Sequence, residues 1–117
     1  MKTQILVVDD DAGSRNALTT LLRDEGFTVI GVPGGREAMQ YLRESPPQLI
    51  VLDLMMPGVD GWELRHAQKQ DPRLAAIPVI AVSAAGKLVD ADAQFRKPLD
   101  YEKFLEAVRR YVKPAPA

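Results

Sequence analysis

The chain has 117 residues, enough for one domain with a single core, and 46% of them are hydrophobic. Its formal net charge is −1, so it lacks the basic excess by which proteins bind nucleic acid or anionic lipid. The absence of cysteine excludes disulfides and thiolate metal sites and is typical of a reducing compartment. No apolar stretch has the length of a membrane span, and the N-terminal residues do not resemble a signal peptide. We therefore expect a cytoplasmic protein that contacts neither nucleic acid nor membrane directly.

Short apolar runs alternate with segments of helical periodicity, a pattern that predicts an α/β protein with a parallel sheet. The expected strands are 5–8, 27–32, 48–53, about 78–83 and about 93–96. The expected helices are 16–25, 36–44, 62–70 and 101–112. The side chains expected on the inner helix faces are Ala17, Leu18, Leu21, Leu22, Ala38, Met39, Leu42, Phe104, Leu105 and Val108, with Tyr111 at the margin.

Four of the expected strands end in side chains that can perform chemistry. The first strand ends in Asp9 and Asp10, the third in Asp53, the fourth in Ser83, and the fifth is followed by Lys97. Because right-handed βα crossovers bring the carboxyl ends of parallel strands to one edge of the sheet, these side chains should converge there.

Carboxylates gathered at one edge repel one another unless a cation neutralises them, and oxygen ligands without His or Cys favour Mg²⁺ or Mn²⁺. A carboxylate is also a nucleophile toward phosphorus and can form an aspartyl phosphate. Phosphoryl transfer requires a cation at the phosphoryl oxygens, and a hydroxyl can hydrogen-bond one of them. Lys97 would supply the cation and Ser83 the hydroxyl, with Asp10 and Asp53 at the metal site.

These motifs carry a family resemblance. Four of them occur in order: Val7-Val8-Asp9-Asp10, then Leu52-Asp53-Leu54-Met55-Met56-Pro57-Gly58-Val59-Asp60-Gly61, then Val82-Ser83-Ala84, and finally Lys97-Pro98. Over about residues 4–112 the chain resembles a receiver domain of a two-component response regulator. We therefore expect a receiver domain over residues 1–113, with 114–117 as a tail or the start of a linker.

The resemblance implies a flavodoxin-like, doubly wound sheet of five parallel strands in the order 2-1-3-4-5. It implies these site roles: Asp53 as phosphoacceptor, Ser83 as switch hydroxyl, Lys97 at the phosphoryl group, and a Mg²⁺ or Mn²⁺ site of Asp9, Asp10, Asp53 and the backbone carbonyl of Met55. The implied partner is a histidine kinase or a histidine phosphotransfer protein, which would dock on the first helix near Ser14 and Ala17, with Leu99 beside it. The implied protein is a phosphorylation switch that assists its own phosphoryl transfer and dephosphorylation, rather than a turnover enzyme, and we expect a monomer.

Two departures from the family pattern concern the usual output surface of the family, which is formed by the fourth helix and the fifth strand. Ser83 and Lys97 are only 14 residues apart, so we expect the family's fourth helix to be missing or shortened and residues 84–92 to form a loop. Gln94 stands where the family commonly has an aromatic switch residue, and strand alternation should turn the neighbouring Phe95 to the opposite face. We therefore expect phosphorylation to act through the loop or other helices rather than through dimerisation at the fourth helix and fifth strand.

Other interpretations of the same residues are open. The acids after the first strand could cap a helix, and for Asp11, which lies outside the acidic pair, capping is the expected role. A phosphatase of the haloacid dehalogenase type would need a second acid two residues after the nucleophile, where Met55 stands, which argues against it. A phosphorylation-independent interaction module remains the alternative.

Overall fold

The computed structural model describes residues 3–53, 61–83 and 91–113, with only the backbone for residues 61, 62 and 83. The expected loop at 84–92 falls almost wholly on residues 84–90, which lie outside the described part, and so it stays a prediction. The expected tail at 114–117 and the proposed carbonyl ligand of Met55 also lie outside the described residues.

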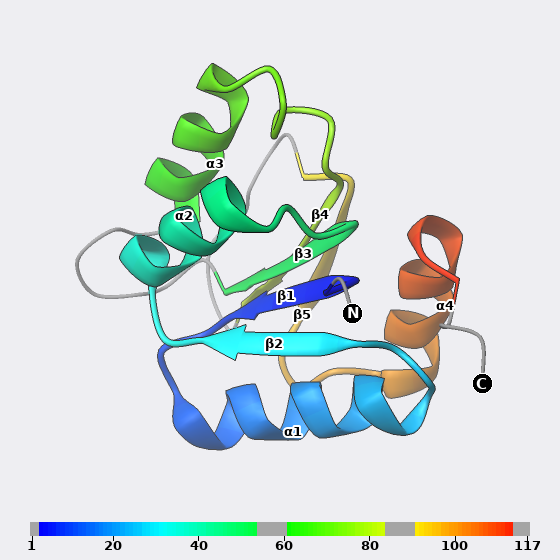
Figure 1. The fold of residues 1–117 in the computed structure, drawn as a ribbon. Coiled ribbons are helices and arrows are strands. Elements are labelled where there is room, and N and C mark those ends of the chain that lie inside the picture. The colour runs from blue at the N-terminus through cyan, green and yellow to red at the C-terminus, as the bar shows by residue number, and fades with distance from the viewer. Residues whose placement is uncertain (1–2, 54–60, 84–90, 114–117) are drawn as a thin grey trace.

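A single sheet of five parallel strands forms the centre of the molecule (Figure 1). The strands are β1 (Ile5–Val8), β2 (Val29–Val32), β3 (Leu49–Asp53), β4 (Val79–Ser83) and β5 (Ala93–Arg96). Their order across the sheet is β2-β1-β3-β4-β5, and every neighbouring pair is parallel. The predicted doubly wound sheet in the order 2-1-3-4-5 is therefore confirmed.

The described helices cover both faces of this sheet. They are α1 (Ala12–Asp24), α2 (Gly35–Glu44), α3 (Gly61–Gln70) and α4 (Tyr101–Tyr111). Figure 1 shows α1 and α4 on one face and α2 and α3 on the other. The label α4 thus belongs to the last helix of the chain and not to the family's helix between β4 and β5.

The core consists of two apolar clusters, one on each side of the sheet. Alternate residues of β1 divide between them: Ile5 and Val7 pack with α1 and α4, whereas Leu6 and Val8 pack with α2 and α3. All four side chains are fully buried. This explains why the strand is apolar without alternation, because a parallel strand covered on both faces meets hydrophobic neighbours on each. Both clusters fix the strand end from which the acids Asp9 and Asp10 follow.

Helix α1 begins at Ala12, four residues earlier than predicted. The carboxylate of Asp11 accepts a hydrogen bond from the backbone N–H of Ser14 at 2.7 Å and thereby caps the helix. The prediction that Asp11 is a cap is confirmed. The helix start inferred from the apolar pattern is wrong, because the first turn carries no apolar stripe. Ala17 is exposed rather than buried. The helix ends before Gly26, whose φ of 95° favours glycine.

The other boundaries differ from the prediction by small amounts. Strand β2 begins at Val29 rather than 27, and Phe27 is buried in the core just before it. Tyr111 is 36% exposed, with its hydroxyl donating to the carbonyl oxygen of Asp92 at 3.4 Å, so its expected burial is wrong. The remaining expected helix residues are buried or half-buried as predicted.

Gln4 joins both ends of the described chain at the edge of the sheet where the strands begin. Its side chain is buried, and its Nε2 donates to the carbonyl oxygen of Lys113 at 2.7 Å. Its Oε1 accepts from the backbone N–H of Thr28 at 3.0 Å, and its own carbonyl oxygen accepts from Gln48 N at 2.8 Å. Through its side-chain amide and its backbone carbonyl, this one residue connects the start of β1 with the segments before β2 and β3 and after α4.

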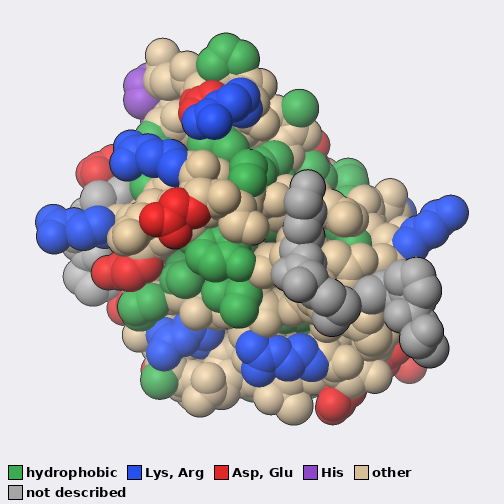
Figure 2. Space-filling model, viewed as in Figure 1, with side chains coloured by type: hydrophobic (Ala, Val, Ile, Leu, Met, Phe, Trp, Pro, Cys, Tyr) green, Lys and Arg blue, Asp and Glu red, His purple; other side chains and the backbone are tan. Residues whose placement is uncertain are grey.

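The surface carries both signs of charge. Figure 2 shows basic and acidic side chains interspersed with apolar ones over the face in view. Among the helices of the described residues, none combines the length and the apolar character that crossing a membrane requires.

Candidate functional site

Three carboxylates meet where β1 and β3 end. Asp9 and Asp10 follow β1, and Asp53 is the last residue of β3; one carboxylate oxygen from each lies within 4.8 Å of the others. The parallel register aligns Val8 with Leu52, which places the two strand ends side by side. Asp9 and Asp53 are buried, with 1% and 8% of their surface exposed, whereas Asp10 is exposed. The predicted convergence of these acids at one edge is therefore what the structure shows.

Asp9 is held from several directions. Its Oδ1 accepts from the backbone N–H of Asp11 at 3.0 Å, and its backbone N–H donates to the carbonyl oxygen of Val32 at 3.1 Å. Its carbonyl oxygen accepts from Nη1 of Arg15 at 2.8 Å. Its Oδ2, in contrast, is buried without a hydrogen-bond partner among the described residues. A buried carboxylate oxygen in that state is costly unless a cation compensates it.

Lys97 brings a cation to these acids from the end of β5. Its Nζ lies 3.6 Å from Oδ2 of Asp9 and 3.7 Å from Oδ2 of Asp53. The Lys97 side chain is 28% exposed, so the ammonium is partly screened from solvent while it remains accessible at the rim. A single ammonium thus lies within ion-pair distance of both buried carboxylates, and the predicted convergence of the ends of β1, β3 and β5 is confirmed.

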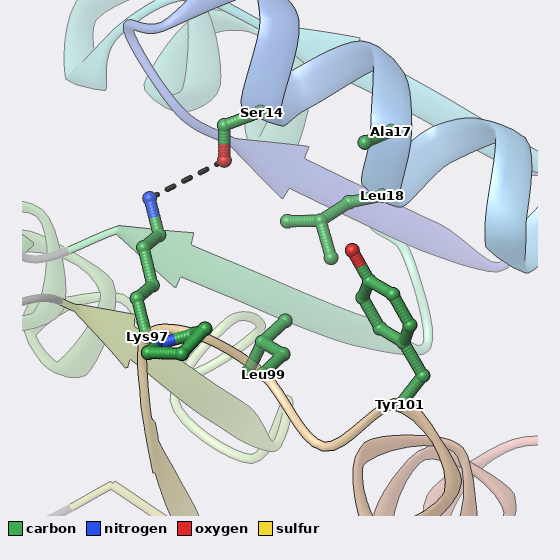
Figure 3. Close-up of a pocket in the computed structure, with 7 residues that line it drawn as sticks. Ser14, Ala17, Leu18, Lys97, Leu99 and Tyr101 are labelled. Atoms are coloured by element: carbon green, nitrogen blue, oxygen red, sulfur yellow. Dashed lines mark hydrogen bonds between the residues drawn. The ribbon is translucent and has the colours of Figure 1, made fainter.

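The hydroxyl of Ser14 is a further partner of Lys97. Nζ of Lys97 donates to Oγ of Ser14 at 3.3 Å, across the gap between β5 and the first turn of α1 (Figure 3). Sequence reasoning placed Ser14 only on the outer surface of α1 and missed this contact. No local signal reveals it, because the two residues are 83 positions apart in the chain.

Beside Ser14 and Lys97 the surface is hollowed. The hollow has a volume of about 370 Å³ and lies between α1 and the segment that joins β5 to α4. Its lining residues are Ser14, Ala17, Leu18, Lys97, Pro98, Leu99 and Tyr101. Figure 3 shows Leu18, Leu99 and Tyr101 facing one another across it. The three residues that the sequence assigned to partner docking, Ser14, Ala17 and Leu99, therefore line one surface.

The remaining predicted site residues are placed only in part. Ser83 is the last residue of β4, next to Val82, which pairs with Asp53, so its backbone is at the same edge of the sheet. Its side chain lies outside the description. Gln94 is exposed, whereas Phe95 packs against the core and stacks edge-on against Phe104, with ring centroids 5.9 Å apart. The predicted alternation of Gln94 and Phe95 is confirmed.

The donor set suits a hard divalent cation. All three side chains supply oxygen, they converge within 4.8 Å, and Oδ2 of Asp9 lacks a hydrogen-bond donor among the described residues. Oxygen ligands of this kind are those that Mg²⁺ and Mn²⁺ prefer. Asp9, Asp10 and Asp53 are thus the described side chains that would hold such an ion.

A doubly wound parallel sheet with acids and a lysine at the carboxyl ends of its strands places the chain in the class of α/β domains to which receiver domains belong. The comparison with known families agrees with this class. The model of the response regulator receiver domain matches residues 5–109, and the chain belongs to this family. It is a receiver domain of two-component signalling.

Individual relatives support the same assignment. An uncharacterised 14.6 kDa protein of Leptolyngbya boryana is 36% identical, with 92% of this chain and 88% of that protein covered. The DNA-binding response regulator MtrA of Mycobacterium tuberculosis is 34% identical over 93% of this chain, which spans only 50% of MtrA. A response regulator receiver protein of Pseudomonas putida has the same fold, with a TM-score of 0.86, 30% identity and coverage of 94% of this chain and 98% of that one.

Proposed function

We propose that Asp53 accepts a phosphoryl group from a phosphohistidine on a histidine kinase or a histidine phosphotransfer protein. The observation that supports this proposal is the position of Asp53 at the end of the central strand, with Oδ2 3.7 Å from Nζ of Lys97 and its carboxylate within 4.8 Å of those of Asp9 and Asp10. A nucleophilic carboxylate flanked by a cation and by metal ligands is the arrangement that phosphoryl transfer needs.

In the proposed transfer, a carboxylate oxygen of Asp53 attacks phosphorus, an O–P bond forms, and the P–N bond to the donor imidazole breaks. The imidazole leaves with the electron pair of that bond and takes up a proton. Lys97 follows the negative charge from the carboxylate to a phosphoryl oxygen, a short movement because its Nζ already lies beside Oδ2 of Asp53. The hydroxyl of Ser83 hydrogen-bonds another phosphoryl oxygen and moves inward, which is the proposed switch.

The proposed cofactor is Mg²⁺, or Mn²⁺, held by Asp9, Asp10, Asp53 and the carbonyl of Met55. When bound, the ion neutralises charge on the phosphoryl oxygens. Asp9 is held in place by its bonds to Asp11 and Arg15, so the ligand does not have to be ordered when the ion arrives.

The proposed docking surface for the phosphodonor is the hollow between α1 and the segment after β5. Its apolar lining by Leu18, Leu99 and Tyr101 offers an area that a partner helix can bury, and Lys97 at its rim leads directly to Asp53. We place the receiver domain over residues 1–113 and its action in the cytoplasm, where kinases that use ATP operate.

The receiver would act as a switch that assists its own phosphorylation and dephosphorylation, not as an enzyme with a separate substrate. We do not extend the DNA binding of MtrA to this chain, which spans half of that protein and has a net charge of −1. The phosphorylated domain would pass its signal to a protein partner or pass the phosphoryl group on to another histidine.

The test is labelling by acetyl phosphate with Mg²⁺, followed by intact-mass measurement. The wild-type protein should gain one phosphoryl group, and Asp53→Asn should gain none. Asp71→Asn is the matched control, since Asp71 lies after α3 away from the strand ends and its loss should leave the label in place. A phosphoryl adduct on Asp53→Asn would refute the assignment, and an unlabelled wild-type protein would favour the phosphorylation-independent module.

A further inference from the structure

The ammonium of Lys97 is closer to a hydroxyl than to either carboxylate. Its distance to Oγ of Ser14 is 3.3 Å, against 3.6 Å to Asp9 and 3.7 Å to Asp53. Both carboxylate distances exceed the usual length of a charge-assisted hydrogen bond, which is about 2.7–2.9 Å. The ammonium is thus held to one side of the two acids, toward α1.

The fold fixes the backbone of Ser14 for this contact. Ser14 lies in the first turn of α1, and its backbone N–H donates to the capping carboxylate of Asp11 at 2.7 Å. Figure 3 shows its Oγ directed across the gap to Nζ of Lys97, at the end of the hollow opposite Tyr101. Ser14 is half-buried, so solvent competes only partly for the hydroxyl.

Lys97 and a divalent cation need the same oxygens. The two carboxylate oxygens nearest to Nζ belong to Asp9 and Asp53, two of the three acids that converge as a candidate metal site. If the ammonium closed on these oxygens, a cation would have to displace it. A neutral hydroxyl that accepts a hydrogen bond from the ammonium lowers this competition without adding charge to the site.

We propose that Ser14 is a positioning residue that holds Lys97 back from Asp9 and Asp53 and so keeps these carboxylates available to a divalent cation. This proposal rests on the proposed function, because it concerns the same lysine and the same metal site. It assigns to the first turn of α1 a role inside the phosphoacceptor site in addition to its place on the docking surface.

The test is a double-mutant cycle on Mg²⁺ affinity, measured by calorimetric titration of the unphosphorylated protein. Ser14→Ala should raise the Kd for Mg²⁺ by about three- to tenfold, which corresponds to the net free energy of one ordinary hydrogen bond. In a Lys97→Met background the same change should leave the Kd unaltered, because the competing ammonium is gone. Ser14→Thr keeps the hydroxyl and should keep the wild-type Kd.

A second readout needs no metal. The NMR signals of the Lys97 side-chain ammonium and its Cε should shift in Ser14→Ala and stay in place in Asn16→Ala, a matched control at an exposed position of the same helix. Thermal unfolding of both alanine variants checks that the fold is unchanged.

Several results would overturn the proposal. They are an unchanged Kd in Ser14→Ala, an equal loss of affinity in the Lys97→Met background, or a loss in Ser14→Thr as large as in Ser14→Ala. Absence of Mg²⁺ binding in the wild-type protein would overturn both this proposal and the proposed cofactor. Failure of Asp53 labelling with this cycle intact would overturn the proposed function alone.

Discussion

Gly31 of β2 lies directly beneath the side chain of Arg15 in α1. A methyl group on its Cα would approach Cγ of Arg15 to 2.9 Å and Cγ2 of Thr19 to 3.1 Å. Arg15 in turn donates from Nη1 to the carbonyl oxygen of Asp9 at 2.8 Å. A residue without a side chain on the edge strand therefore lets the arginine lie against the sheet and reach the end of β1, where the first site carboxylate begins.

This packing predicts that Gly31→Ala destabilises the protein. We expect a loss of about 1–3 kcal/mol in the free energy of unfolding, because Arg15 and Thr19 must both move. The loss should shrink in an Arg15→Ala background, although Thr19 still limits the space. Gly13→Ala is the control: its methyl group would lie 3.5 Å from Asp11 Oδ2, an ordinary contact, so stability should stay constant or rise by up to about 1 kcal/mol. Urea unfolding measures all four variants.

Asp10 and Asp11 are neighbours in sequence with different predicted roles in cation binding. Asp10 belongs to the cluster of three carboxylates, whereas Asp11 caps α1. We expect Asp10→Asn to weaken Mg²⁺ binding by at least about tenfold, the loss typical even of residues that only support a metal ligand. Asp11→Asn keeps a good capping residue and should change the Kd much less. Equal losses of Mg²⁺ affinity in a calorimetric titration would contradict the assignment, because Asp11 would then contribute to ion binding as much as Asp10.

The hollow beside α1 predicts a difference between protein and small-molecule phosphodonors. Ala17 is exposed and lines the hollow, so Ala17→Glu should obstruct docking and slow transfer from a phosphorylated histidine protein by about tenfold, equivalent to about 1.4 kcal/mol. Labelling by acetyl phosphate should be nearly unchanged, since Asp53 and Lys97 are untouched. Thr20→Glu, an exposed position of α1 outside the hollow, is the control. If both donors slowed together, the docking role would be contradicted.

The exposed face of β5 has Gln94 where the family commonly has an aromatic switch residue. We therefore expect that phosphorylation does not cause dimerisation through this face. Phe95 is directed into the core against Phe104, and Gln94 on the other face has no ring with which to remodel a surface. We expect light scattering to give the mass of a monomer with and without beryllofluoride and Mg²⁺. A doubling of mass with beryllofluoride that is lost in Arg96→Glu, an exposed residue of β5, would contradict this expectation.

The strand ends were predictable because a buried parallel strand has a simple signature. Continuous apolar runs define β1 and β3, and the first charged residue after each run must lie at the edge of the sheet, which located Asp9 and Asp53. Lys97 was placed after β5 on different grounds, because it follows the short run 93–96 and precedes Pro98. The alternation of side chains along a strand was enough to separate Gln94 from Phe95.

The supporting contacts were not predictable in the same way. The bonds from Lys97 to Ser14 and from Arg15 to the carbonyl of Asp9 join common surface residue types, and nothing in the local sequence distinguishes them. Gln68 is a similar case: it reads as a polar helix residue, yet it is buried and donates to the carbonyl oxygens of Leu74 and Ile77 at 2.8 Å. The start of α1 was missed because its first turn carries no apolar stripe, although the expected cap at Asp11 marks it.

The hydrogen bond from Gln4 to Lys113 brings the two ends of the described chain together. Nε2 of Gln4, just before the first strand, lies 2.7 Å from the carbonyl oxygen of Lys113, two residues after α4, on the edge of the sheet opposite the carboxylates. A short peptide joining these two points would therefore leave the strand order intact, and the backbone could be opened instead at the exposed turn around Pro72 and Arg73. Such a circular permutant would keep the edge that carries the three carboxylates and Lys97, because contacts across the sheet hold that edge together.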